Sequence, residues 1–182
     1  MTATNPFFDI SLLPYQAPHF DEITDDHYRP AFDEALRQKR ADVDAIVSQT
    51  AAPDFTNTVL ALEKSGAMLS RVSSVFFAMT SANTNTYLQE LEEQFSTELA
   101  ALANDIWLND VLFARVESVW QDRAALDAES RRLAEETYQR FILAGARLNE
   151  TEKAELKALN TEAATLTSQF NQRLLAADRK SV

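Results

Sequence analysis

Few residues in this 182-residue sequence could do chemistry. It holds no cysteine and only two histidines, His19 and His27. The lack of cysteine excludes disulfides, thiolate catalysis and cysteine-ligated zinc or iron–sulfur sites, and it agrees with a reducing compartment. The two imidazoles bracket four carboxylates, and these two side-chain types together suit several divalent metals. The carboxylates are Asp21, Glu22, Asp25 and Asp26.

The spacing of this cluster argues against a metal site. Metal ligands on one helix are usually three or four residues apart, whereas His19 and His27 are eight apart, and His19 follows Pro18. Neither histidine is followed by glutamate, so the sequence has no His-Glu-x-x-His zinc motif. Solvated acids at a helix start explain the pattern, because they complement the positive end of the helix dipole.

Two further acidic groups could belong to a di-iron bundle, which needs inward glutamates and a Glu-x-x-His motif. No Glu-x-x-His occurs, so a solvated helix face is the better interpretation. Ser73 and Ser74 have no companion base. We therefore assign no catalytic, cofactor-binding or metal-binding residue to this chain. The acidic groups are Glu90, Glu92 and Glu93, and Glu135 with Glu136.

An aromatic and methionine cluster is the remaining candidate for a binding patch. Phe76, Phe77 and Met79 could form an adaptable surface for a peptide or a cofactor. Their helical spacing favours core packing instead. They lie in the stretch 55–80, which we interpret as one helix, apolar over most of its circumference and hence central in a bundle. Gly66 inside it is expected to permit a close helix crossing.

The distribution of helix-breaking residues predicts an all-α fold. All five prolines lie at or before Pro53, and residues 54–182 contain only two glycines among abundant helix formers. We expect a bundle of about five to six helices. The first helix is expected from Thr24 to about Ser48 with a kink or restart at Pro30, and Asp54 or Thr56 is expected to cap the central helix. Thr84 is the expected cap of the next helix, which either breaks at Asn109–Asp110 or continues as one kinked helix, and residues 127–130 open a further element. Gly145 is the expected carboxyl-terminal cap, and Asn149 with Glu152 forms a variant capping box before the last helix.

Two apolar stripes indicate which helix faces pack inward. The first is expected to face the central helix and comprises Tyr87, Leu91, Phe95, Leu99, Leu102 and Ile106. The second is close to a heptad seam and comprises Leu156, Leu159, Ala163, Leu166, Phe170, Leu174 and Ala177.

Residues 1–23 differ from the rest because three prolines forbid a regular helix there. We expect an extended arm that packs on the bundle, followed by one helical domain over 24–182. A free tail would carry fewer large apolar groups than this arm, which has Phe7, Phe8, Ile10, Leu12, Leu13, Tyr15 and Phe20.

Charge and hydropathy narrow the partners. The net charge of -11 disfavours nucleic acid and anionic membranes as partners. No secretion signal is recognisable, and no apolar run approaches the roughly 20 residues of a membrane helix. We expect a soluble cytoplasmic protein.

Several segments resemble one family of enzymes. Over nearly the whole chain, up to about Asp178, the sequence is similar to the start of bacterial peptidyl-dipeptidases, also called dipeptidyl carboxypeptidases, within the thimet oligopeptidase-like zinc metallopeptidases. The segments that carry this resemblance are 15–21, 27–34, 57–66, 74–79 and 159–171.

The resemblance implies a helical, two-lobed enzyme that encloses a deep channel and removes carboxyl-terminal dipeptides from short peptides. The zinc ligands and general base of this family lie on a His-Glu-x-x-His helix, with a further glutamate ligand, and none of these matches a residue here. The chain would then be an amino-terminal fragment, inactive alone, that forms part of the wall or cover of the channel. Its partners would be the remainder of the enzyme and its peptides. Exposed apolar surface and some self-association are expected where the remainder would dock.

A second hypothesis is a stand-alone helical protein-interaction module without catalysis. The coding sequence after Val182 discriminates the two, because a continuation with His-Glu-x-x-His would establish the first.

Overall fold

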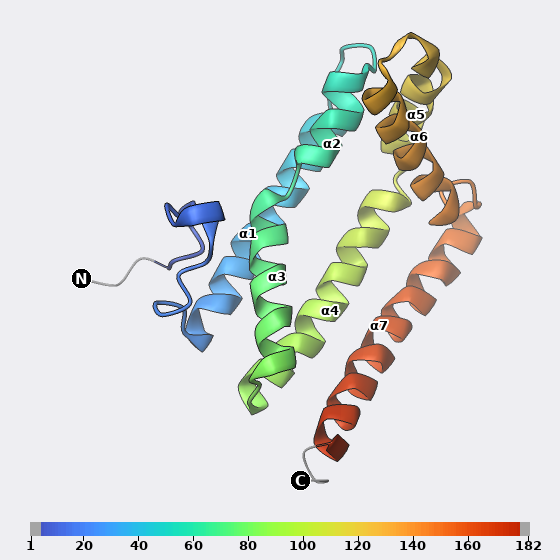
Figure 1. The fold of residues 1–182 in the computed structure, drawn as a ribbon. Coiled ribbons are helices and arrows are strands. Elements are labelled where there is room, and N and C mark those ends of the chain that lie inside the picture. The colour runs from blue at the N-terminus through green and yellow to red at the C-terminus, as the bar shows by residue number, and fades with distance from the viewer. Residues whose placement is uncertain (1–4, 179–182) are drawn as a thin grey trace. The chain divides into compact units, whose positions relative to one another are not determined.

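The computed structural model describes residues 5–178, which form helices and no strand, confirming the all-α prediction (Figure 1). Six helices are longer than a single turn within this range, and a π-helical segment at Phe55–Leu60 leads into the one-turn helix α2. Short 3-10 turns lie at Pro14–Gln16 and Arg123–Ala125. The helices are α1 (Asp25–Val47), α2 (Ala61–Lys64), α3 (Ala67–Ala82), α4 (Thr86–Trp107), α5 (Asp110–Gln121), α6 (Ala128–Leu143) and α7 (Glu150–Asp178).

The chain divides into two compact units. The first unit comprises Met1–Lys39, Gly66–Ser96 and Thr165–Val182, and the second comprises Arg40–Ser65 and Thr97–Ala164. Helices α1, α4 and α7 contribute residues to both units. The prediction of a single helical domain over 24–182 stays a prediction.

Aromatic side chains build the core of the first unit. The rings of Phe32 and Phe95 stack with centroids 3.8 Å apart, and Phe76 lies 4.7 Å from Phe95 and 5.1 Å from Tyr28. All four side chains are buried. Each such pair stabilises the fold by about 0.5–1.5 kcal/mol beyond simple area burial. The core interpretation of Phe76 is therefore confirmed, while Phe77 and Met79 are half-buried.

The core of the second unit forms where the π-helical segment, α5 and α6 meet. Val59, Val119 and Ala134 are its buried centre. Around them pack the partly buried side chains of Phe55, Leu126 and Leu133. On α6, Phe141 is fully buried against Trp107 and Phe113.

The predicted single helix over 55–80 is wrong, because the chain breaks at Ser65 and Gly66. Ser65 has an extended ψ of 144°, and Gly66 has a left-handed φ of 75°. An α-helix cannot pass through this geometry, so α2 ends and α3 begins here. Gly66 was expected to permit a close helix crossing inside one helix. The atoms nearest to it belong to the Lys39 side chain, whose Cδ would lie 2.6 Å from a Cβ built at Gly66.

Most of the predicted helix ends are confirmed. Asp54 forms a capping box with Asn57, Asn149 forms one with Glu152, and Asn109 and Asp127 cap α5 and α6. Beyond α6, Gly145 adopts a φ of 97°, and the Ala146 amide donates back to the Phe141 carbonyl, as in a Schellman motif. These caps satisfy amide and carbonyl groups that the helices leave unpaired.

Three local expectations need correction. The Asn85 side chain, not Thr84, accepts a hydrogen bond from the Leu88 amide at the start of α4. Leu88 is buried where Tyr87 was expected, and Tyr87 is 40% exposed. Helix α1 spans Pro30 and does not restart there, because the proline lies close enough to the amino terminus for few intrahelical bonds to be lost.

The amino-terminal arm is anchored mainly at its start. Phe7 is buried, the Asn5 side chain donates to the His27 carbonyl, and the Arg71 guanidinium donates to the Phe7 carbonyl. The other large apolar side chains of the arm are exposed, and the prediction that the whole arm packs on the bundle stays a prediction. They are Phe8, Ile10, Leu12, Leu13, Tyr15 and Phe20.

We predict that Gly66→Ala lowers the free energy of unfolding by about 1–2 kcal/mol, because alanine disfavours a left-handed φ. The new Cβ would also press on Lys39, so the loss should shrink but persist in a Lys39→Ala background. Urea unfolding followed by circular dichroism measures both. Equal stability of Gly66→Ala and the unsubstituted chain would show that the break is not strained.

Candidate functional site

The histidine and carboxylate cluster does not assemble in the structure. Within residues 5–178, no group of three histidine, aspartate or glutamate side chains could hold a metal ion. The His27 ring accepts a hydrogen bond from the Thr24 amide, and Asp25 accepts one from the Asn85 side chain. His19 lines a separate cavity of about 10 Å³, room for at most one water. His27 and Asp25 are thus each engaged by a structural hydrogen bond.

The acidic side chains on the helices also have separate structural partners. Glu135 pairs with Arg123, Glu136 pairs with Arg132, and Glu93 accepts a hydrogen bond from Gln169. They therefore do not form a shared carboxylate cage.

Glu92 is not fully exposed, although a solvated helix face was expected there. It is half-buried, and this burial raises the pKa of its carboxyl group above the usual range. Glu90, by contrast, is exposed. Sequence reasoning missed the difference, because both residues belong to one run of acids.

A hollow of about 590 Å³ in the first unit is lined partly by apolar side chains and partly by charged side chains that already have partners. Hydrogen bonds from the Arg37 guanidinium, and a weaker one from Gln38, lower the pKa of Glu34 to about 2. Asp33, also in the lining, pairs with Arg29 one turn away. A carboxylate held ionised in this way is a poor proton acceptor, so the hollow does not resemble a general acid–base site.

A buried arginine organises the second unit. Arg115 on α5 is only 7% exposed. Its guanidinium donates to the carbonyls of Gln49 and Ala51 at 3.3 Å and to the side-chain oxygen of Asn57 at 3.1 Å. These bonds join α5 to the segment that leads from α1 into the π-helical turn. They also supply acceptors to a cation that would otherwise be costly to bury.

The Asn57 side chain is the polar group at which several hydrogen bonds meet. Its side-chain oxygen accepts from Arg115, from the Asp54 amide and from the Thr58 hydroxyl, and its side-chain nitrogen donates to the Ala52 carbonyl. Thr58 and Val59 beside it are fully buried. The segment that begins at Asn57, one of those that mark the family resemblance, therefore has a structural explanation.

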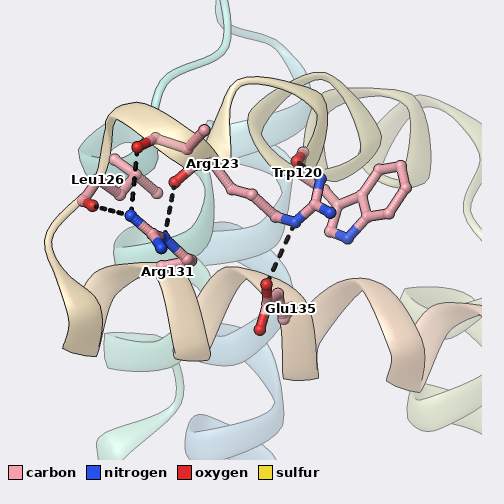
Figure 2. A network of polar contacts seen from close by, with 6 residues as sticks. Trp120, Arg123, Leu126, Arg131 and Glu135 are labelled. Carbon is pink, nitrogen blue, oxygen red and sulfur yellow. Dashed lines mark hydrogen bonds and ion pairs between the residues drawn. The ribbon is translucent and has the colours of Figure 1, made fainter.

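A second arginine network closes the connection between α5 and α6 (Figure 2). Arg131 donates to the carbonyls of Arg123, Ala124 and Leu126, so it satisfies the turn at Arg123–Ala125. The Arg123 guanidinium lies 4.2 Å from the Trp120 ring centroid and pairs with Glu135. The two arginines and Glu135 are thus engaged by contacts within this connection, which fits a structural role.

Four large apolar residues of α7 are exposed, opposite to the expectation from its heptad pattern, whereas Leu156 is half-buried. Leu166, Phe170 and Leu174 are 57%, 64% and 58% exposed, and Leu159 is 61% exposed. Periodicity identifies an apolar face but not what lies against it.

None of the helices in the described part of the chain combines the length and apolar character that crossing a bilayer requires.

Comparison with known proteins identifies close relatives. The chain is 67% identical over 179 residues to the dipeptidyl carboxypeptidase of Salmonella typhimurium, a match that covers 97% of this chain and 26% of the relative. It is 65% identical over 181 residues to the dipeptidyl carboxypeptidase of Escherichia coli, covering 98% and 27%. Oligopeptidase A of Escherichia coli is 23% identical over 176 residues, covering 96% and 25%.

The chain thus matches the amino-terminal part of these peptidases and spans about a quarter of their length. No protein-family model matches it.

We predict that Asn57→Ala lowers the free energy of unfolding by about 2–4 kcal/mol, because it removes a helix cap and an acceptor of a buried arginine together. Asn109→Ala, which removes a cap alone, is the matched control and should cost about 1 kcal/mol. Urea unfolding measures both. A loss at Asn57 no larger than that at Asn109 would show that the Arg115 contact adds nothing.

We also predict that Glu92→Gln raises the melting temperature at pH 7. Its raised folded-state pKa means that ionisation of Glu92 opposes folding, a cost that grows as pH rises from the unfolded-state value, about 4.3, through the folded-state value. The two proteins should melt alike near pH 3, where both side chains are neutral. Glu90→Gln, at an exposed position, is the control. Equal melting of wild type and Glu92→Gln at pH 7 would contradict the prediction.

Proposed function

We propose that this chain is the amino-terminal helical region of a cytoplasmic zinc-dependent peptidase that removes carboxyl-terminal dipeptides from short peptides. The observation that carries the proposal is the 67% identity, over 179 residues, to a protein named dipeptidyl carboxypeptidase. Identity at this level over nearly the whole chain supports a shared structural role. The activity itself is inferred from that name.

Zinc does not fit the residues of this chain. The sequence has no cysteine and no His-Glu-x-x-His, and the described residues offer no cluster of three ligands. His19 lies in the arm and His27 lies in the first turn of α1, where its ring accepts a hydrogen bond from the Thr24 amide. We therefore place the metal and the general base in the part of the polypeptide beyond this chain, and we derive no catalytic step here.

A scaffold role follows from how the chain uses its polar residues. Internal hydrogen bonds engage the side chains of four polar residues, Arg115, Asn57, Arg123 and Arg131. Side chains engaged in this way hold helices in place and leave few groups for reaction. We propose that the helices form part of the wall or cover of a peptide channel that the remaining polypeptide completes, and that the chain alone is inactive.

The second candidate is a stand-alone helical interaction module. The exposed apolar residues of α7 favour it, because such a face can bind a separate protein or a second copy of the chain. The large share of the relatives that lies outside this chain favours the peptidase region instead.

A peptidase assay on two proteins tests the proposal. The 182-residue chain and the longer polypeptide encoded by its gene would each receive zinc and an amino-terminally blocked short peptide, and released dipeptides would be measured by mass spectrometry. We expect release only by the longer polypeptide, and its loss on metal chelation. A longer polypeptide with its His-Glu-x-x-His histidines replaced is the matched control.

Two results would overturn the proposal. Chelator-sensitive release by the 182-residue chain would show that it carries catalytic groups. A gene that ends with this chain, or a longer polypeptide without dipeptide release, would favour the interaction module.

A further inference from the structure

Helix α7 is built with its polar side inward in the first unit. Ser168 is 4% exposed, Gln169 donates to Glu93, and Gln172 donates to the Gln89 carbonyl at 2.9 Å. These hydrogen bonds attach α7 to α4 through amide, carboxylate and carbonyl groups.

The apolar side chains gather on the opposite surface. Leu166, Phe170 and Leu174, here called the α7 face, are spaced four residues apart and lie within about a quarter of the helix circumference. Each is more than half exposed. Gln172 and Ser168 lie on the far side of the same turns. A helix on the surface of a globular protein normally turns its apolar side toward the core. The opposite orientation of α7 therefore indicates that a further partner covers the α7 face.

The size of the α7 face helps to identify that partner. Three such side chains can bury only a few hundred Å² in total, against roughly 800 Å² on each side of a typical stable protein complex. A contact within one polypeptide avoids most of the entropy lost when two molecules associate, so it can be stable with less buried area. A small apolar face is therefore better suited to a segment of the same chain than to a second molecule.

The relatives are long enough to contain such a segment outside the matched region. The match covers 97% of this chain but only 26% of the dipeptidyl carboxypeptidase of Salmonella typhimurium, so such a polypeptide has about three times as many residues beyond this region as within it. The spacing of the apolar residues is close to the heptad pattern by which one helix packs along another.

We infer that the α7 face packs against an apolar helix from the part of the polypeptide beyond this chain. The inference rests on the proposed function only in requiring a longer polypeptide, and it needs no peptidase activity. Helix α7 thereby connects two layers, with amide contacts to α4 on one side and apolar contacts to the added helix on the other.

Thiol labelling tests the inference directly, because the chain has no cysteine of its own. Phe170→Cys would be introduced into the 182-residue chain and into the longer polypeptide, and the rate of maleimide labelling of the new thiol would be measured above the background of the unsubstituted protein. We expect rapid labelling in the short chain and labelling at least roughly tenfold slower in the longer polypeptide, where reaction requires local opening.

Asn171→Cys is the matched control, since Asn171 is exposed and lies about 100° around α7 from the centre of the face. It should label at similar rates in both proteins. A second variant, Phe170→Glu, should leave the melting temperature of the short chain unchanged and lower that of the longer polypeptide by several degrees, whereas Asn171→Glu should lower neither.

The outcomes separate the inference from the proposed function. Equally rapid labelling of Phe170→Cys in both proteins would overturn the inference, even if the longer polypeptide released dipeptides. Protection of the longer polypeptide only at concentrations where it dimerises would also overturn it, because a second copy would be the occupant. Concentration-independent protection in a longer polypeptide without peptidase activity would support the inference and reject the proposed function.

Discussion

The buried guanidinium of Arg115 is the constraint on which the second unit depends. A cation that is 7% exposed must keep its hydrogen-bond acceptors, and three of them come from the short segment between α1 and α2. That segment can therefore adopt few other conformations. Asn57 then fixes the start of the π-helical turn, and the turn presents Val59 to Val119 and Ala134 in the core. One charged side chain thus links a loop, a helix start and the apolar packing.

Local signals in the sequence predicted most helix ends, because capping depends on neighbouring residues. Asp54, Asn109, Asp127, Asn149 and Gly145 all act where the sequence indicated. The break at Gly66 was missed because apolar periodicity continues across it, and a glycine in a helix has the same sequence signature as a glycine that ends one. The orientation of α7 was missed because periodicity does not reveal which side of an amphipathic helix meets the protein.

For the titratable residues, the sequence supplied the residue types and their spacing but few of their structural partners. The spacing of His19 and His27 argued against a metal site, and the structure gives the two rings different surroundings. The contacts of Glu93 with Gln169 and of Glu135 with Arg123 join separate elements, so no local pattern reports them. The pairs Glu34–Arg37 and Glu136–Arg132 are neighbours on one helix, at spacings that the sequence does display. Arg115 carried no sequence signal, since a lone arginine on an amphipathic helix is ordinarily solvated. Its role appears only once the distant carbonyls of Gln49 and Ala51 are placed beside it.

The outward apolar residues of α7 also bear on how a longer polypeptide would be made. An amino-terminal region leaves the ribosome first, at about 5–20 residues per second, so these side chains would wait on the order of tens of seconds for the segments that follow. During that interval the nascent chain would expose an apolar helix face that can associate with other chains. The net charge of -11 counters association between such chains, because like-charged molecules repel. The acidity of this region would then serve its biosynthesis as well as the finished protein.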